Sequence, residues 1–268
     1  MIISLLNEKG GVGKTTSAII ISNILARAGY SVLLIDLDTQ INATTIMGLG
    51  EGDDENLYNM LLHELEQDKI NNLIKETAYP NMYIIPGKRD YVRIYTEIEN
   101  FESHLTLKTN LNKLTTRFDY IIIDNSPSRS PMEVSAICAS DYILAPISPN
   151  NLSFDGIVNM IQLVDNLNKA YDLCVKFKGI FMARVFKRTR IFNDLFESFQ
   201  EEFGTKFIPV SISNATVIDE MNTLFKPLLE YNKKSIPANE YIELVNYLNL
   251  IDNEHFQILT TFRNSRGR

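Results

Sequence analysis

A glycine-rich segment near the N-terminus constrains the fold more than any other part of the chain. It reads NEKGGVGKTTS, residues 7–17, and lies between a short apolar run, IISLL, and a stretch with helical spacing. Gly10, Gly11 and Gly13 allow the backbone to curl, so that successive N–H groups and the start of the next helix point at one anion. The order strand, loop, helix therefore predicts a phosphate-binding loop of the P-loop kind.

The first position of this loop departs from the usual pattern, which is Gly, four free positions and then Gly-Lys-Ser/Thr. Glu8 stands where the first glycine is expected, and an additional lysine, Lys9, follows it. The rest of the pattern is intact: Lys14 is placed to reach the outer phosphates of a nucleotide, and Thr15 to offer its hydroxyl to Mg²⁺. The residues expected to surround the phosphates are Gly10, Gly11, Val12, Gly13, Lys14, Thr15 and Thr16.

Short apolar runs recur along the chain between longer stretches with helical spacing. Each run is too short for a helix and almost continuously apolar, as expected of strands covered on both faces. The alternation predicts one α/β domain over residues 1–268, with a doubly wound, mostly parallel sheet and helices on both faces. The expected strands are IISLL, SVLLIDLD, MYIIPG, YIIIDNS, YILAPIS, GIFMARV and KFIPVSI, and the expected helices are 15–28, 57–65, 155–167, 192–203 and 239–248, with a further C-terminal helix and frayed basic tail in 250–268.

Composition limits what the chain can bind. Its formal net charge is −7, so the molecule as a whole repels nucleic acid and anionic membrane, and any such contact needs a local basic patch. No signal peptide is visible and no run reaches the ~18 apolar residues of a membrane span, which predicts a cytoplasmic protein. Cys138 and Cys174 lack CxxC spacing, which argues against a disulfide or zinc site and favours two small buried hydrophobic residues.

Carboxylates follow two of the predicted strands. SVLLIDLD ends with Asp36 and Asp38, and strand alternation puts both on one side at the carboxyl edge of the sheet, where ligands bind in such folds. The run FDYIIIDNSPS likewise ends its apolar stretch with Asp124. An aspartate pair that caps a helix start is the alternative interpretation of Asp36 and Asp38.

The segment KGGVGKTT, preceded by Asn7, resembles the deviant Walker A motif of the ParA/MinD family of ATPases. The resemblance covers residues 2 to about 190 well. It implies that Lys9 reaches across a dimer interface to the phosphates of the nucleotide held by the other subunit, so that Lys9 joins Lys14 as a nucleotide-binding and catalytic residue. A solvated surface lysine is the alternative.

Two further segments resemble the same family. DTQINAT resembles its switch segment, with Thr39 in place of the usual proline, and implies that Asp38 orients the attacking water while Asp36 supports the magnesium shell through water. The strand that ends at Asp124 resembles a Walker B strand, whose carboxylate reaches Mg²⁺ indirectly. The family usually has two prolines before the serine, whereas this chain has Ser126 and Pro127 before Ser128, which puts the detailed switch geometry in doubt. The resemblance thus implies an ATP and Mg²⁺ site, with Thr15, Asp36 and Asp124 around the metal and a base contact near Pro209.

The function implied by the resemblance is partition of DNA, from a plasmid or a chromosome. ATP would drive a sandwich dimer that binds DNA without sequence preference in the nucleoid, and a centromere-binding, ParB-like partner would trigger hydrolysis. FKRTR resembles the family's basic turn, so Lys187, Arg188 and Arg190 are the expected DNA contacts. Solvated surface is the alternative for these charges. The segment PVSISNATVIDE lacks the two arginines that chromosomal members carry there, which weakens the DNA footprint.

Other functions fit the sequence less well. MinD-like membrane positioning needs an amphipathic C-terminal helix, and the tail has Phe256, Leu259 and Phe262 at three-residue spacing beside arginines, although a packing helix is favoured. Electron transfer needs cysteine ligands for an iron–sulfur cluster, and none follows Asp124 at a suitable position. A pure ATP-binding switch would not need the water-positioning carboxylate of Asp38.

Overall fold

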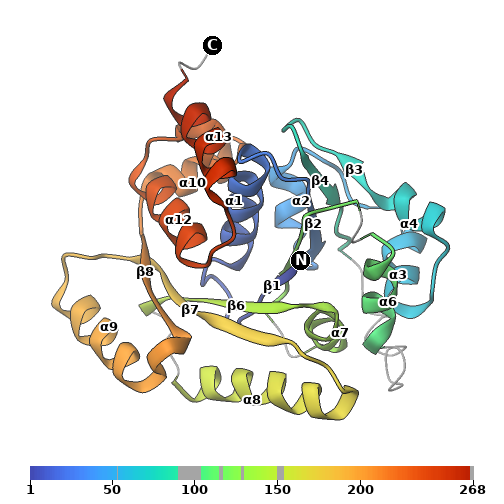
Figure 1. Cartoon of the computed structure of the whole chain (residues 1–268), viewed down its shortest axis with the longest axis horizontal. Helices are drawn as coiled ribbons and strands as arrows, with labels where there is room; N and C mark the ends of the chain where they lie inside the picture. The colour runs from blue at the N-terminus through green and yellow to red at the C-terminus, as the bar shows by residue number, and fades with distance from the viewer. Residues whose placement is uncertain (53, 90–103, 115–116, 128–129, 150–153, 266–268) are drawn as a thin grey trace.

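The strands of the computed structural model form one mixed sheet, shown in Figure 1. The structure describes residues 1–52, 54–89, 104–114, 117–127, 130–149 and 154–265. Within these ranges the sheet has eight strands in the order β3-β4-β2-β5-β1-β6-β7-β8, and every neighbouring pair is parallel except β3 and β4. The strands are β1 (Ile2–Leu5), β2 (Val32–Leu37), β3 (Lys75–Glu76), β4 (Met82–Ile85), β5 (Tyr120–Asn125), β6 (Tyr142–Ile147), β7 (Lys176–Val185) and β8 (Phe207–Ser213).

All seven apolar runs of the sequence form strands of this sheet, so the predicted doubly wound α/β fold is confirmed. The sequence did not predict β3. Its two residues, Lys75 and Glu76, are exposed and pair antiparallel with β4 at the edge of the sheet. A polar edge strand of this length has no apolar pattern that could mark it.

Helices cover both faces of the sheet (Figure 1). One face carries the helices whose apolar residues share a core with α1. The opposite face is divided between two further cores, one under the helices of the middle of the chain and one under α8 and α9. The first face holds α1 (Lys14–Arg27), α2 (Asn42–Ile46), α10 (Thr216–Thr223), α11 (Leu228–Asn232), α12 (Ile236–Tyr247) and α13 (Asn253–Asn264), and the second holds α3 (Asp54–Leu62), α4 (Gln67–Leu73), α6 (Thr106–Asn112), α7 (Pro131–Ala139), α8 (Phe154–Tyr171) and α9 (Arg190–Phe203), with the short 3-10 turn η3 (Gly204–Lys206) after α9.

Strand β2 shows why the apolar runs are continuous. Val32 and Leu34 pack into the core of the α1 face, and Leu33 and Ile35 pack into the core of the opposite face. All four side chains are fully buried. Each such burial contributes about 1.5–3 kcal/mol to folding, so alternate residues of one strand stabilise both helix layers.

The C-terminal region forms a packed helix, as the sequence favours. Asp252 caps α13 by accepting a hydrogen bond from the His255 N–H, and Leu259 is fully buried. The Phe262 ring lies under the Arg27 guanidinium of α1 at 4.6 Å. The last three residues of the basic tail, 266–268, lie outside the described residues.

Two expectations need correction. Cys138 is buried in α7, but Cys174 is exposed in the connection before β7, so only one of the two cysteines is a buried hydrophobic residue. Helix α12 begins at Ile236, earlier than the predicted residue 239, because Ser235 accepts a hydrogen bond from the Ala238 N–H and caps the helix.

Candidate nucleotide site

Asn7 fixes the start of the phosphate loop to a neighbouring strand. Its side-chain Nδ2 donates to the Pro146 carbonyl of β6 at 2.8 Å, and its Oδ1 accepts from the Lys9 backbone N–H at 2.9 Å. Gly11 and Gly13 have φ of 72° and 98°, a left-handed conformation that favours glycine, and Gly13 is the N-cap of α1. The backbone is therefore curled where the sequence predicts a phosphate cradle, and it leads directly into a helix N-terminus.

Lys14 is buried inside this curl. Its Nζ donates to the backbone carbonyls of Asn7 at 2.8 Å and Lys9 at 3.1 Å. Burial lowers the pKa of the ammonium, and the nearby carboxylates of Asp124 and Asp38 oppose that shift. The cation is thus held at the base of the loop by the loop itself.

Two carboxylates lie side by side beneath the loop because of strand register. Asp36 of β2 is paired with Asp124 of β5, and Asp124 is paired with Leu5 of β1, the strand that leads into the loop. Both aspartates are fully buried. Burial raises the pKa of Asp36 to about 6, and burial together with the charge of Asp36 raises the pKa of Asp124 well above its usual range.

The partners of the two aspartates differ. Asp36 Oδ2 accepts from the Thr44 N–H at 2.8 Å and the Thr44 hydroxyl at 2.7 Å, so Asp36 caps the first turn of α2, as the alternative interpretation holds. The Thr15 side chain lies close to Asp124 and opposes the rise of its pKa, but within the described residues neither oxygen of Asp124 makes a hydrogen bond of normal geometry. A buried carboxylate with so little hydrogen bonding is costly unless a cation or water completes the site.

The oxygen atoms of Thr15, Asp36 and Asp124 suit a Mg²⁺ ion that is bound partly through water molecules. No group of three or more His, Cys, Asp or Glu side chains in the described part of the chain could enclose a metal ion. Mg²⁺ commonly keeps several waters and binds through one or two carboxylates together with substrate phosphates. The Thr15 hydroxyl would hold the ion directly, and Asp124 and Asp36 would hold it through waters.

Thr44 and Gly87 are site residues that sequence reasoning missed. The Thr44 hydroxyl donates to Asp36 and accepts from the Gly87 N–H at 2.8 Å. A Cβ at Gly87 would lie 2.9 Å from the Asp36 carboxyl carbon, so only glycine fits there without displacement. Thr44 belongs to the matched segment DTQINAT and Gly87 ends the run MYIIPG, so both lay within segments already quoted.

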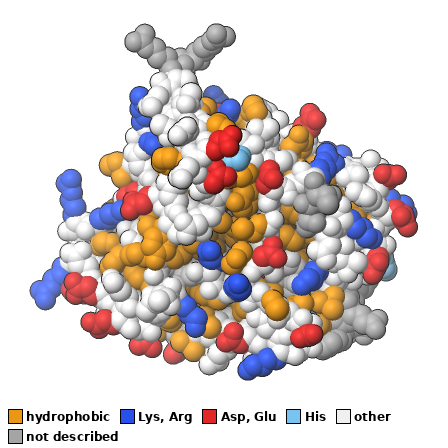
Figure 2. Space-filling view, viewed as in Figure 1, with side chains coloured by type: hydrophobic (Ala, Val, Ile, Leu, Met, Phe, Trp, Pro, Cys, Tyr) orange, Lys and Arg blue, Asp and Glu red, His pale blue; other side chains and the backbone are white. Residues whose placement is uncertain are grey.

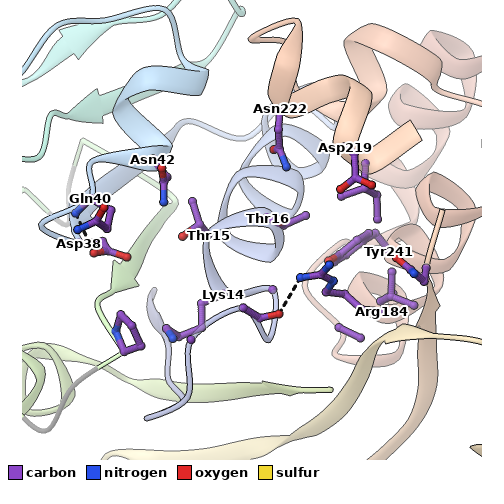
Figure 3. Close-up of a pocket in the computed structure, with 18 residues that line it drawn as sticks. Lys14, Thr15, Thr16, Asp38, Gln40, Asn42, Arg184, Asp219, Asn222 and Tyr241 are labelled. Carbon is purple, nitrogen blue, oxygen red and sulfur yellow. Dashed lines mark hydrogen bonds between the residues drawn. The ribbon is translucent and has the colours of Figure 1, made fainter. Parts of the chain in front are cut away.

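The loop opens into a cavity of about 360 Å³, shown in Figure 3. Asp38 stands at one end of the view, where its Oδ1 accepts from the Gln40 N–H at 3.0 Å. The other end is formed by side chains that sequence reasoning did not assign to the nucleotide, from β7, the end of β8, α10 and α12. The lining residues are Gly10, Gly11, Gly13, Lys14, Thr15, Thr16, Asp38, Gln40, Asn42, Pro127, Ala183, Arg184, Ile212, Asn214, Ile218, Asp219, Asn222 and Tyr241.

Five of the residues expected at the nucleotide or its metal do not line this cavity. Val12 is fully buried behind the loop. Lys9 is exposed, and its ammonium makes no hydrogen bond or ion pair with any residue the structure describes. The side chains of Asp36 and Asp124 are fully buried and do not reach the surface of the cavity.

Pro209 lies elsewhere, and its placement corrects the expected base contact. It is exposed in β8 and lines a separate hollow with Lys187 and Phe192. Strand β8 continues for several residues beyond the proline, and the chain after Pro209 first lines the nucleotide cavity at Ile212.

The basic turn after β7 has mixed surroundings. Lys187 Nζ forms an ion pair with Glu240 of α12 at 2.7 Å, and the same carboxylate accepts from the Ser213 N–H. Arg188 is exposed, and Arg190 lies 3.7 Å from Asp194 with 93% of its side chain exposed. On the face in Figure 2, basic side chains are interspersed with acidic ones rather than gathered in one field.

Fold, curled loop and in-register carboxylates together define a P-loop nucleotide-binding protein of the α/β class. A family model described as an AAA domain matches residues 1–177. The chain therefore belongs to this AAA domain family, as a member of the ParA/MinD type of P-loop ATPases.

Individual relatives agree with this assignment. The sporulation initiation inhibitor protein Soj of Bacillus subtilis is 28% identical over 245 residues, which are 91% of this chain and 96% of that protein. A putative plasmid partition protein of Borrelia burgdorferi, solved with AMPPNP, is similar with a TM-score of 0.74 and 26% identity, over 93% of this chain and 99% of that one. McdA of Cyanothece, solved with ATP, has the same fold, with a TM-score of 0.80 and 21% identity over 94% of this chain and 97% of that one.

Proposed function

We propose that this protein is a magnesium-dependent ATPase of the ParA type that serves DNA partition. The observation that carries the proposal is the register of β2, β5 and β1, which places Asp36 and Asp124 side by side under a curled phosphate loop. A buried pair of carboxylates next to a buried lysine is costly for folding alone and suits a charged ligand. The names of the relatives, chromosome and plasmid partition proteins among them, support the partition role.

The phosphate loop, Lys14 and Asp38 have distinct parts in ATP hydrolysis. The N–H groups from Gly10 to Thr16 and the Lys14 ammonium bind the phosphates and stabilise the charge that develops on them. Asp38, which lines the cavity, orients a water in line with the γ-phosphate. Bound Mg²⁺ would neutralise phosphate charge beside Thr15 and the two buried carboxylates.

Dimerisation on ATP is the second part of the proposal, and Lys9 supports it. Its ammonium is exposed outside the cavity of its own chain and has no partner among the described residues. A cation so placed can offset phosphate charge only on a nucleotide held by another molecule, so that ATP binding and association become linked.

DNA and a ParB-like adaptor are the proposed partners of the dimer. Arg188 and Arg190, both exposed, can contact phosphates at a salt-dependent affinity. Membrane positioning receives less support, because Leu259 and Phe262 of α13 pack against the rest of the protein, which leaves Phe256 and Ile258 as the exposed apolar side chains of this helix. Among the described residues, no helix has the length and apolar character needed to cross a bilayer.

Light scattering after size exclusion tests the dimer proposal. The parent protein should be monomeric with Mg–ADP and dimeric with Mg–AMPPNP, whereas Lys9→Ala should bind the analogue and remain monomeric. Lys69→Ala, which removes an exposed lysine of α4, is the matched control and should behave as the parent. Normal dimerisation of Lys9→Ala would contradict the cross-subunit role.

A further inference from the structure

Strand β7 is irregular next to the phosphate loop. Between Met182 and Val185 its pairing with β8 shifts register, so that three steps along β7 match two steps along β8. Within this bulge Arg184 has φ of 58°, a left-handed conformation that a residue with a long side chain rarely adopts. Bulges beside functional sites commonly re-aim one side chain.

The bulge directs Arg184 to the loop. Its Nη1 donates to the Gly11 carbonyl at 2.9 Å, as the dashed line in Figure 3 marks. Within the described residues this is the only hydrogen bond of the side chain, and it makes no ion pair there. A guanidinium has five N–H donors, so most of its donors stay available beside the cavity.

The position of Arg184 in the cavity separates it from the hydrolysis machinery. Figure 3 shows it beside Tyr241, at the end away from Asp38 and Gln40. Because the proposed function places the γ-phosphate at Asp38, a cation at the opposite end of the cavity would lie near the part of the nucleotide that the diphosphate and triphosphate share.

We infer that Arg184 is a nucleotide-binding residue of its own chain. It holds the curled loop through Gly11 and contacts the shared part of ADP and ATP with its free donors. This inference rests on the proposed nucleotide site and adds to it a second cation, supplied by the same chain, that neither the loop motif nor the switch segment contains.

Backbone strain favours a ligand role over a structural one. Glycine and asparagine tolerate a left-handed φ better than arginine does. Arginine at position 184 therefore lowers the stability of the folded protein, and glycine or asparagine at this position would relieve the strain. Strained conformations persist at sites where the side chain has a task. A residue kept only for folding would be expected to match its backbone conformation.

Calorimetric titration of four variants with Mg–ADP and Mg–AMPPNP tests the inference. Arg184→Asn and Arg184→Gly should lower the affinity for Mg–ADP and for Mg–AMPPNP by the same factor. We expect about 10-fold, which corresponds to the loss of one hydrogen bond from a charged donor. Arg184→Lys should recover part of this loss, because it keeps the charge without the forked geometry. Lys176→Asn, at the far exposed end of β7, is the control and should not change either affinity.

Two further measurements separate the role from a structural one. The melting temperature of ligand-free Arg184→Gly should equal or exceed the parent's, and the same concentration of Mg–ADP should raise it less than it raises the melting temperature of the parent. Unchanged affinities in both variants, loss for AMPPNP alone, or a lower melting temperature of Arg184→Gly would overturn the inference. A parent protein that binds neither nucleotide would instead overturn the proposed function.

Discussion

The phosphate-loop edge and the basic turn after β7 carry the two proposed activities, and they differ in how their charges are held. At the loop edge, Lys14, Asp36 and Asp124 are almost wholly buried, and strand register or loop carbonyls fix their positions. At the basic turn, Arg188 and Arg190 are exposed, and Lys187 is paired with Glu240.

The difference teaches how far charge alone can support a functional claim. A buried charge is costly unless a partner compensates it, so its position is evidence for a ligand or a network. An exposed charge that no hydrogen bond fixes costs little and can point in many directions, so its position constrains function only weakly. The following experiments should give large effects at the buried edge and small ones at the turn.

Lys14→Ala should have the largest effect. It removes the buried cation that is placed to bind the phosphates, and we expect the affinity for ADP to fall about 100-fold or more, the loss of several charge-assisted contacts. Calorimetric titration measures it. Lys14→Met is the control for collapse of the loop, because it removes the charge and keeps the length of the aliphatic side chain. Binding within a factor of about three of the parent's in both variants would contradict the assignment.

Asp38→Ala should separate binding from hydrolysis. The carboxylate lines the cavity and is expected to position water, so phosphate release should slow by about 10²–10⁴-fold while AMPPNP affinity is retained. Single-turnover phosphate release measures the chemical step. A variant that hydrolyses ATP at the parent rate would remove Asp38 from the mechanism.

Sequence reasoning succeeded where the signal was local. Each core strand is a continuous apolar run, and the loop motif occupies consecutive residues, so periodicity and spacing located β1, β2, β5 and the cradle between β1 and α1. The register of β2 with β5 places Asp36 beside Asp124, two residues that the resemblance assigns to one magnesium site, at the carboxyl edge where ligands bind in such folds.

It failed where the site depends on tertiary placement. Arg184 lies in an apolar strand run and reaches the loop only because of a bulge, which no local pattern marks. Pro209 was placed at the base by resemblance, but β8 continues to Ser213 and carries the chain past it. Lys187 could not be recognised as an ion-paired residue, since Glu240 lies far away in the sequence.

The buried carboxylates should also leave a mark on stability. Because the pKa of Asp36 is about 6 in the folded state and 3.8 as the reference value, the folded protein binds more protons between these values. The contribution of Asp36 to the free energy of unfolding should therefore fall as pH rises through about 4 to 6 and stay level above it. Asp36→Asn should show a flatter profile in denaturant titrations across this window. Parallel profiles for parent and variant would mean that Asp36 does not titrate there.

The basic turn should give the smallest effects, and the three cations should differ. The charge of Lys187 is already offset by Glu240 at 2.7 Å, so Lys187→Ala should weaken binding to an arbitrary DNA duplex about twofold or less, whereas Arg188→Ala should weaken it several-fold and lower the salt slope by about one. The loss of DNA affinity in Arg190→Ala should lie between those of the other two variants, because Asp194 lies 3.7 Å from Arg190 but both side chains are solvated. Fluorescence anisotropy with Mg–AMPPNP at several salt concentrations measures all three. Equal losses would mean that the ion pair opens on DNA, and then the buried edge and the exposed turn would differ less than their contacts indicate.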